Sequence, residues 1–189
     1  MNKPLFLFVG KSASGKTTIA NLLESCGYTQ VYSYTTRQQR FENEPGHVFI
    51  TEHEYDQLEN IVASTIYNGN RYCTTLEQIQ DADIYVVDPP GVQTLLNNYD
   101  KVNRDIHIVY FAARTHTRIK RMIERGDSDT QIVGRLLNDE ENDWLGKIYD
   151  YVEDACKSNK QVYVCVIDAD LSLQQVYTDI KDFIAEGSY

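Results

Sequence analysis

The residues best suited to chemistry form one short loop near the start of the chain. Residues 10–17 have the spacing G-x-x-x-x-G-K-T, in which the glycines let the backbone approach an anion closely. Consecutive backbone N–H groups and the start of a following helix can then face negative charge. Lys16 would reach the outer phosphates of a triphosphate, and the Thr17 hydroxyl would bind Mg²⁺. The spacing therefore predicts a loop that binds ATP and Mg²⁺ through Gly10, Ser12, Ala13, Ser14, Gly15, Lys16, Thr17 and Thr18.

Such a loop needs a strand before it and a helix after it. Residues 5–9 form a continuous apolar run, which is typical of a buried parallel strand. Residues 17–26 carry apolar side chains at helical spacing, and Gly27 ends the pattern. The alternative is a glycine-rich turn that fits the motif by chance. The flanking patterns favour the phosphate-binding loop.

The rest of the chain repeats this alternation of strands and helices. Three further apolar runs predict buried strands, and two amphipathic stretches predict helices (strands at 84–87, 106–111 and 162–167; helices at 117–125 and 171–185). The pattern favours an α/β fold with a parallel sheet flanked by helices. The second strand ends in Asp88, whose carboxylate would lie near Mg²⁺ or near an acceptor substrate. Taken alone, an aspartate at a strand end is more often a turn former or a helix cap.

Two regions interrupt the alternation. Residues 31–73 are rich in Tyr, Thr, Asn and Glu and have only short apolar runs, which indicates a small inserted lobe with strand and hairpin character. Residues 114–144 are dense in charge, which fits a solvated helical segment. We therefore expect one domain over residues 1–189, with a core at 1–32, 75–113 and 145–189, an acceptor-binding lobe at about 33–74 and a lid at about 114–144.

Composition narrows the class of partner. The chain has 189 residues, a formal net charge of −10 and a pI near 4.8, which disfavours nucleic acid and anionic lipid as partners. A small anionic substrate remains compatible, because a site can be locally basic. The four cysteines have neither zinc-binding nor C-x-x-C spacing, so we interpret them as reduced thiols. We expect a soluble cytoplasmic protein, monomeric or homodimeric, without a membrane-spanning segment.

Six short motifs, in the same order over nearly the whole chain, resemble the guanylate kinase family. Each motif is weak alone, but together they are specific. They are S-x-T-T-R-x-x-R at 33–40, the G-N-x-Y turn at 69–74, D-x-x-G-V at 88–92, the R-x-x-x-R-G start of the lid at 121–126, the second lid arginine at 135–136 and the closing strand and turn at 166–171. The resemblance implies a P-loop kinase fold and transfer of the γ-phosphoryl group of ATP to a nucleoside monophosphate, with GMP or dGMP as the leading acceptor.

The resemblance also implies roles for individual residues. Three side chains would bind the acceptor's phosphate (Arg37, Arg40 and Tyr72), and three would line the pocket for its base (Ser33, Thr74 and Asp88). The catalytic cations would be Lys16 and three lid arginines, Arg121, Arg125 and Arg135, which would close over the transferring phosphoryl group. Two guanidiniums three residues apart can converge on one phosphate. Phosphoryl transfer depends on positioning and charge neutralisation, so we expect no protein nucleophile.

Simpler interpretations remain open for these residues. Arg37 and Arg40 could be solvated surface arginines, and Tyr72 could be an ordinary sheet aromatic. The lid arginines at 121 and 125 could pair with Glu124 or Asp127. Arg135 also follows the first lid motif at a spacing one residue shorter than the usual family pattern.

Three positions depart from the family pattern in the acceptor lobe and beside it. Ala63 stands where the family carries a glutamate that reads guanine, His47 replaces a phosphate-binding tyrosine, and Val86 replaces an acid. Loss of a carboxylate that reads guanine should remove most base discrimination. His47 could bind phosphate when protonated, or it could be an exposed turn histidine.

These departures keep two other functions open. One is a related kinase that phosphorylates ribose 1,5-bisphosphate and needs no guanine reader. The other is a guanylate-kinase-like binding module without catalysis. Such modules typically have a degraded phosphate loop, and the intact residues 10–17 argue against that interpretation.

Overall fold

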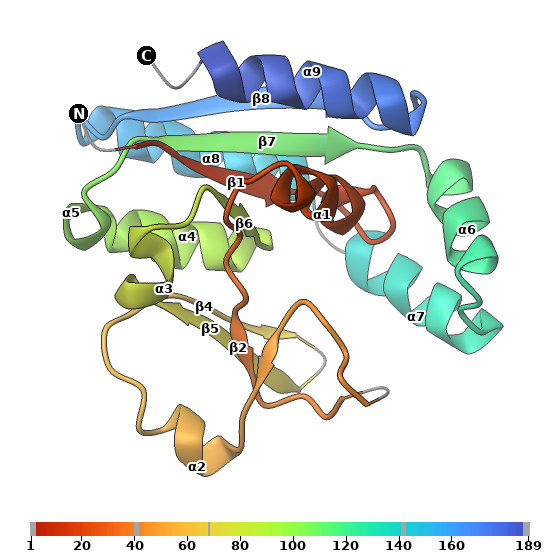
Figure 1. Cartoon of the computed structure of the whole chain (residues 1–189), viewed down its shortest axis with the longest axis horizontal. Helices are drawn as coiled ribbons and strands as arrows, with labels where there is room; N and C mark the ends of the chain where they lie inside the picture. The colour runs from red at the N-terminus through yellow and green to blue at the C-terminus, as the bar shows by residue number, and fades with distance from the viewer. Residues whose placement is uncertain (1–2, 40–41, 68, 141–142, 187–189) are drawn as a thin grey trace.

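A four-stranded parallel sheet forms the centre of the computed structural model, which describes residues 3–39, 42–67, 69–140 and 143–186. The strand order is β6-β1-β7-β8 (Figure 1). The bounds of the four predicted strands are confirmed to within one residue: β1 at Leu5–Val9, β6 at Ile84–Val86, β7 at Ile106–Ala112 and β8 at Val162–Asp168. The predicted burial is wrong for β8, because it lies at the edge of the sheet and, of its residues, only Val162 and Ile167 are buried. Every residue of β1 is buried, because helices cover both faces of the sheet, and this explains its uninterrupted apolar sequence.

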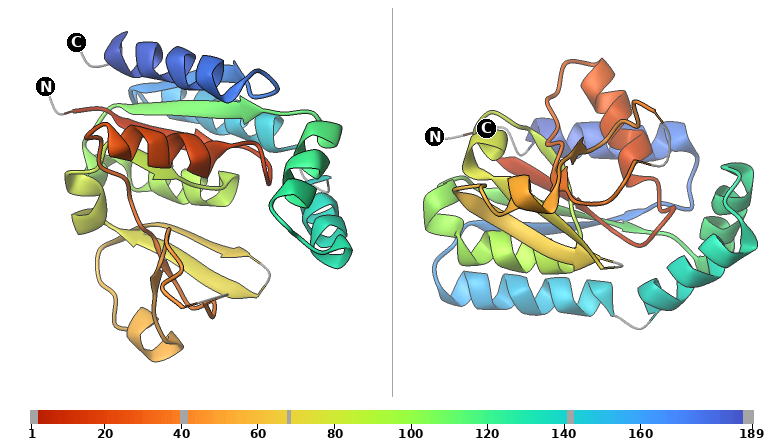
Figure 2. Two further views of the ribbon diagram at one scale, coloured as in Figure 1. Left: turned by 45° about the vertical axis from the view of Figure 1, so that its right-hand side comes forward. Right: turned by 90° about the horizontal axis from the view of Figure 1, so that it is seen from below.

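Two helical layers enclose this sheet, as the right-hand view of Figure 2 shows. On one face, α1 (Lys16–Ser25) and α9 (Leu173–Glu186) insert Ile19, Leu23, Val176 and Ile180 into a buried cluster. On the other face, α4 (Pro89–Asn97) and α8 (Trp144–Lys157) contribute Leu95, Leu96 and Ile148 to a second cluster. The short helices α3 (Leu76–Gln80) and α5 (Tyr99–Val102) lie on this second side. This arrangement confirms the predicted α/β class.

A smaller sheet makes up the inserted lobe, in the order β3-β2-β5-β4. Its strands are β2 (Tyr34–Thr35), β3 (Val48–Phe49), β4 (Ile61–Tyr67) and β5 (Asn70–Thr75), and the short helix α2 (Glu52–Tyr55) lies between β3 and β4. Helix α4 holds the hairpin against the core, since Thr94 Oγ1 donates to the carbonyl of Ser64 at 3.2 Å. The hairpin register pairs Ala63 with Thr74 and Thr65 with Tyr72, so these four side chains share one face.

The charged segment folds into two helices, α6 (Thr115–Glu124) and α7 (Asp129–Glu140), which follow the carboxyl end of β7 (Figure 1). The prediction of a solvated segment is only partly correct. Arg118 and Met122 of α6 are buried, as are Ile132 and Asp139 of α7. In the described ranges, no helix has the length and apolarity needed to cross a bilayer.

Candidate active site

The phosphate-binding loop connects β1 to α1 in a tightly wrapped conformation. Gly10 has φ of 153°, and a Cβ there would lie 2.7 Å from the carbonyl oxygen of Phe111, so only glycine fits. Ala13 and Gly15 also have positive φ, at 60° and 103°. The Lys16 ammonium donates to the carbonyl oxygens of Gly10 at 2.5 Å and Lys11 at 3.0 Å. The loop thus folds around the side chain of Lys16, which is the first residue of α1.

A cavity of about 370 Å³ opens at the amino end of α1. Its wall combines the loop and two arginines, at 121 and 125, with apolar side chains. Arg121 bridges two parts of the wall, because its Nη2 donates to the carbonyl of Ala169 at 2.7 Å and its Nη1 to that of Ser14 at 3.3 Å. Cationic and apolar groups in one wall suit a ligand that has both phosphates and a base. The lining residues are Ala13 to Ile19, Arg121, Glu124, Arg125, Ala169, Leu171, Leu173 and Val176.

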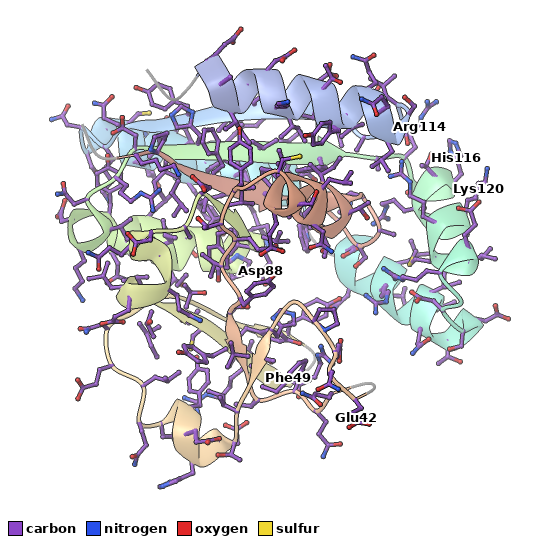
Figure 3. All side chains as sticks on the ribbon, in the orientation of Figure 1. Glu42, Phe49, Asp88, Arg114, His116 and Lys120 are labelled. Carbon is purple, nitrogen blue, oxygen red and sulfur yellow. The ribbon has the colours of Figure 1, made fainter. Side chains whose placement is uncertain are left out.

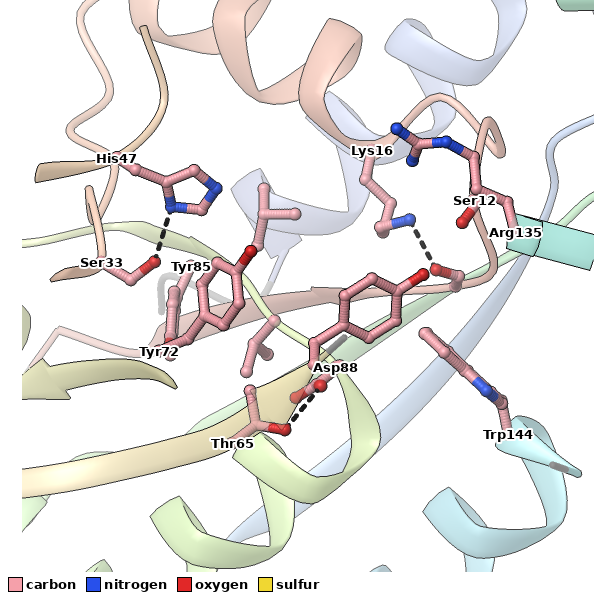
Figure 4. A pocket seen from close by; sticks show the side chains of 14 residues that line it. Ser12, Lys16, Ser33, His47, Thr65, Tyr72, Tyr85, Asp88, Arg135 and Trp144 are labelled. Carbon is pink, nitrogen blue, oxygen red and sulfur yellow. Dashed lines mark hydrogen bonds between the residues drawn. The ribbon is translucent and has the colours of Figure 1, made fainter. Parts of the chain in front are cut away.

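A second cavity, of about 240 Å³, lies between the loop, the end of β6 and the lobe (Figure 4). Two hydrogen-bonded pairs lie in its wall. Ser33 Oγ lies 3.0 Å from His47 Nδ1, and Thr65 Oγ1 donates to Asp88 Oδ2 at 2.9 Å. Asp88 lies at the junction of core and lobe (Figure 3). Aromatic side chains form much of the remaining wall, namely Tyr67, Tyr72, Tyr85 and Trp144, and Lys16 and Arg135 also line the cavity.

Burial and neighbouring charges shift the pKa values of ionisable groups that line this second cavity, Lys16 and Asp88 among them. Burial lowers the pKa of Lys16 to about 8, although Asp139 and Asp88 act in the opposite direction. Burial also raises the pKa of Asp88, against the stabilising hydrogen bonds from the Gly91 amide and Thr65. A bound phosphate would raise the pKa of Lys16 again, because a nearby negative charge favours the protonated amine.

A third cavity, of about 310 Å³, adjoins the second and contains Arg37. The two cavities share Tyr67, Tyr72 and Arg135. The Arg37 guanidinium binds the Glu44 carboxylate with both terminal nitrogens, at 2.9 and 3.1 Å. Burial would lower the pKa of Arg37, but the contact with Glu44 more than compensates and raises it. A phosphate at this position would have to compete with Glu44.

The structure brings most of the predicted site residues to these three connected spaces. One set lines the second cavity, which we call the acceptor-side cavity after its predicted role: Gly10, Ser12, Lys16, Ser33, Tyr72, Asp88 and Arg135. Another set lines the first cavity, at the amino end of α1, which we call the donor-side cavity: Ala13, Ser14, Gly15, Lys16, Thr17, Thr18, Arg121 and Arg125. Thr74 is not among the lining residues. It is fully buried and pairs with Ala63, one step deeper than the Thr65–Tyr72 pair of the wall. Arg40 lies outside the described residues.

The structure also shows the surroundings of the residues for which simpler interpretations were open. Arg125 does pair with Asp127, as one simpler interpretation proposed, and it still lines the donor-side cavity. Arg135 shares the same aspartate at 3.4 Å. His47 is half-buried and packs against the Tyr72 ring, so the exposed-turn interpretation is wrong. Ala63 is fully buried, and its methyl side chain has no polar atom that could contact a base.

Sequence reasoning missed several residues of the site, among them Thr65, Tyr67, Tyr85, Trp144, Glu44 and Asp139. Thr65 and Tyr67 were detectable, because on a strand they alternate onto the same face as Ala63. Trp144, Glu44 and Asp139 had no local signal, since each reaches the site only through tertiary packing. Glu44 and Asp139 contact the arginines and the loop, and Trp144 lines the acceptor-side cavity.

Thr17 and Asp88 are the residues that could hold a metal. The Thr17 hydroxyl is exposed at the first turn of α1, on the donor-side cavity. Within the described residues, no group of three or more His, Cys, Asp or Glu side chains could hold a metal ion. Two oxygen ligands suit Mg²⁺, which is usually bound by one or two side chains together with the phosphates of a nucleotide.

No family model matches this chain, and no curated protein matches its sequence. Among solved structures, the guanylate kinase from Anaplasma phagocytophilum aligns with a TM-score of 0.56 over 100% of this chain and 88% of that chain, at 15% identity. The fold is guanylate-kinase-like. The likeness confirms the predicted P-loop kinase fold, with its central parallel sheet flanked by helices.

Proposed function

We propose that this protein transfers the γ-phosphoryl group of ATP to a nucleoside monophosphate, with GMP or dGMP as the leading acceptor, giving the diphosphate and ADP. One observation carries the proposal: Lys16 lines both the donor-side and the acceptor-side cavity. A cation at the junction of two substrate cavities is where a transferring phosphoryl group needs charge neutralisation.

The remaining residues position the two substrates. The N–H groups of the loop would bind the phosphates of ATP, and Arg121 and Arg125 would face them from the lid. Thr17 and Asp88 would hold Mg²⁺, which neutralises phosphate charge when bound. Arg37 and Tyr72 would bind the acceptor's phosphate, and Arg135 lies beside both of the cavities that they line. Closure of α6 and α7 would exclude water that otherwise hydrolyses ATP.

A ribose phosphate is the second candidate acceptor. It is favoured by Ala63, which brings no polar group to the place where a guanine reader would be needed. A non-catalytic binding module is less well supported, because the loop keeps Lys16 and its full spacing.

A coupled assay of ADP release tests the acceptor directly. The panel contains GMP, dGMP, AMP, CMP, UMP, dTMP and ribose 1,5-bisphosphate, each with ATP and Mg²⁺. Turnover with a nucleoside monophosphate supports the proposal, and turnover with ribose 1,5-bisphosphate alone supports the second candidate. No acceptor-dependent turnover at all would leave the binding module.

In the same assay, Arg37→Ala should lower kcat/KM for the acceptor by about 100-fold, because a bidentate arginine contact to phosphate contributes roughly 3 kcal/mol. Arg71→Ala is the matched control in the lobe. Arg71 pairs with Glu52 and Asp56 and lines none of the three cavities. Equal losses in both variants would mean that Arg37 acts through the fold of the lobe, not through the phosphate.

Donor binding should also take up a proton in mildly alkaline solution. Because burial lowers the pKa of free Lys16 to about 8, a bound triphosphate should raise it again. At pH 8.5 the uptake should reach roughly 0.7 proton, and near pH 6.5 this lysine should contribute almost none. Calorimetry in buffers of different ionisation enthalpy measures the uptake. Lys16→Arg, which stays protonated, should abolish it, and an unchanged uptake in that variant would exclude Lys16 as its source.

A further inference from the structure

A buried ion pair joins the two lid helices. Arg118 of α6 donates through Nη1 to Asp139 Oδ2 of α7 at 2.6 Å, and the two side chains are 1% and 0% exposed. Among the described residues, the Nε and Nη2 atoms of Arg118 have no hydrogen-bond partner. Such a pair costs desolvation energy that imperfect satisfaction does not recover. Apolar side chains would hold α6 to α7 more strongly than this ion pair does. Stability of the helix pair therefore does not explain why the ion pair is present.

The carboxylate of Asp139 also reaches the phosphate-binding loop. The backbone N–H of Ser12 donates to Oδ2 at 2.9 Å, and the Ser12 hydroxyl lies 3.4 Å from Oδ1. Ser12 and Asp139 are 127 residues apart in sequence, so this contact is made by the fold. The lid thus delivers a negative charge to the loop whose N–H groups are arranged for an anion.

We propose that Asp139 is a carboxylate latch: before the donor binds, it occupies the Ser12 N–H on the acceptor-side face of the loop and holds α7 there, and the donor's terminal phosphate, which must reach that face to be transferred, displaces it. The latch rests on the proposed function, because it requires a triphosphate at the loop. A carboxylate and a phosphate oxygen cannot share one N–H in a buried site without strong repulsion. The two anions therefore exclude each other, and the lid position becomes linked to occupancy of the donor site.

Displacement of the latch has consequences for both arginines. Arg118 loses its carboxylate partner and can offer its charge to the incoming phosphates instead. Arg135 lies four residues before Asp139 on α7, which is about one helical turn, so movement of Asp139 also moves Arg135. Donor binding would in this way reposition the lid arginine that lines the acceptor-side cavity.

Removal of the charge at Asp139 tests the latch. Binding of a non-hydrolysable ATP analogue is measured by calorimetry in the wild type, in Asp139→Asn and in Asp129→Asn, an exposed acid on the same helix that serves as the matched control. Asp139→Asn should bind the analogue about 10-fold more tightly, because no charged carboxylate competes with the phosphate for the Ser12 N–H. Asp129→Asn should stay within about 2-fold of the wild type. Equal or weaker binding by Asp139→Asn would overturn the latch, and a ligand role for Asp139 toward Mg²⁺ would give that result.

The only tryptophan provides an independent readout. Trp144 begins α8, directly after the lid, and lines the acceptor-side cavity. The fluorescence spectrum of nucleotide-free Asp139→Asn should shift toward that of the nucleotide-bound wild type. A spectrum identical to that of the nucleotide-free wild type would contradict displacement of α7.

A second variant covers failure of Asp139→Asn to fold. Arg118→Met with Asp139→Leu removes the whole ion pair and leaves no buried unpaired charge. It should also bind the analogue more tightly than the wild type, by at least about 3-fold, and weaker binding would overturn the latch. A wild type that does not bind the analogue would refute the proposed function. A wild type that binds it, without any gain in the variants, would refute the latch alone.

Discussion

Lys16→Ala should lower kcat by about 1,000-fold, which corresponds to roughly 4 kcal/mol of lost transition-state stabilisation. The ammonium lies inside the loop, with the Gly10 and Lys11 carbonyls around it, and it lines both substrate cavities. Charge that builds up on the transferring phosphoryl group would meet this cation on either side of the transfer. Removal of the amine leaves that charge without its central partner, and the alanine methyl group cannot replace it.

Steady-state ADP release with the acceptor found in the panel measures the effect. Lys11→Ala is the matched control, because it removes the same charge from the same loop, and the Lys11 side chain lines neither the donor-side nor the acceptor-side cavity. It should change kcat by less than about 3-fold. Normal turnover by Lys16→Ala would remove the basis of the proposed function, even if ATP still bound.

The protein's own carboxylates already occupy several of the cations proposed to bind phosphate. Glu44 holds Arg37, and Asp127 contacts both Arg125 and Arg135. Asp139 repeats this arrangement at the loop. If these cations bind phosphate as proposed, each carboxylate would order its cation before substrate arrives and would give way to a phosphate with higher charge. Substrate binding would then be an exchange of anions, and because Asp127 and Asp139 contact the two lid helices, the exchange would link binding to the lid.

The sequence predicted those elements whose pattern is local. The inner strands of the parallel sheet, β1 and β7, are largely buried on both faces, so their apolar runs identified them without tertiary information. Helix α4 was not predicted, because its first residues, Pro89 and Pro90, directly follow a strand, and prolines usually interrupt regular structure. The structure uses them as a helix start, with Asp88 accepting from the Gly91 N–H at 2.9 Å. Helix α8 also begins after an aspartate, because the Asp143 side chain accepts from the Gly146 N–H.

In the candidate site, too, residues in a local sequence pattern could be predicted, and residues brought in by tertiary packing could not. The loop and Arg37 were predictable, because fixed spacing within a few residues determines what they can bind. The latch residue Asp139 was not, since it looks like any acid on a charged helix until the fold brings it to Ser12. The buried position of Thr74 was equally hidden, because it depends on the register of the hairpin and on the depth of the cavity beside it.

Arg104→Met should lower the free energy of unfolding by about 4 kcal/mol, because a buried guanidinium with good hydrogen bonds is costly to remove. Arg104 is 6% exposed and donates to backbone carbonyls of two separate segments, residues 3–4 before β1 and residues 79–82 between α3 and β6. Nε donates to Lys3 at 2.6 Å, Nη2 to Pro4 at 2.7 Å and Ala82 at 2.8 Å, and Nη1 to Ile79 at 2.5 Å. Methionine fills a similar volume but leaves these carbonyls without donors.

Thermal and urea unfolding of the purified protein measure the loss, which corresponds to a decrease in Tm of about 10 °C for a domain of this size. Arg104→Lys should lose less, since an ammonium keeps the charge and three donors. Arg114→Met is the surface control, because the Arg114 side chain is 72% exposed and pairs only with Asp170 among the described acids. It should change stability by less than about 1 kcal/mol. A comparably small loss in Arg104→Met would mean that water replaces the guanidinium. In that case the junction of β1, α3 and β7 would not depend on this arginine.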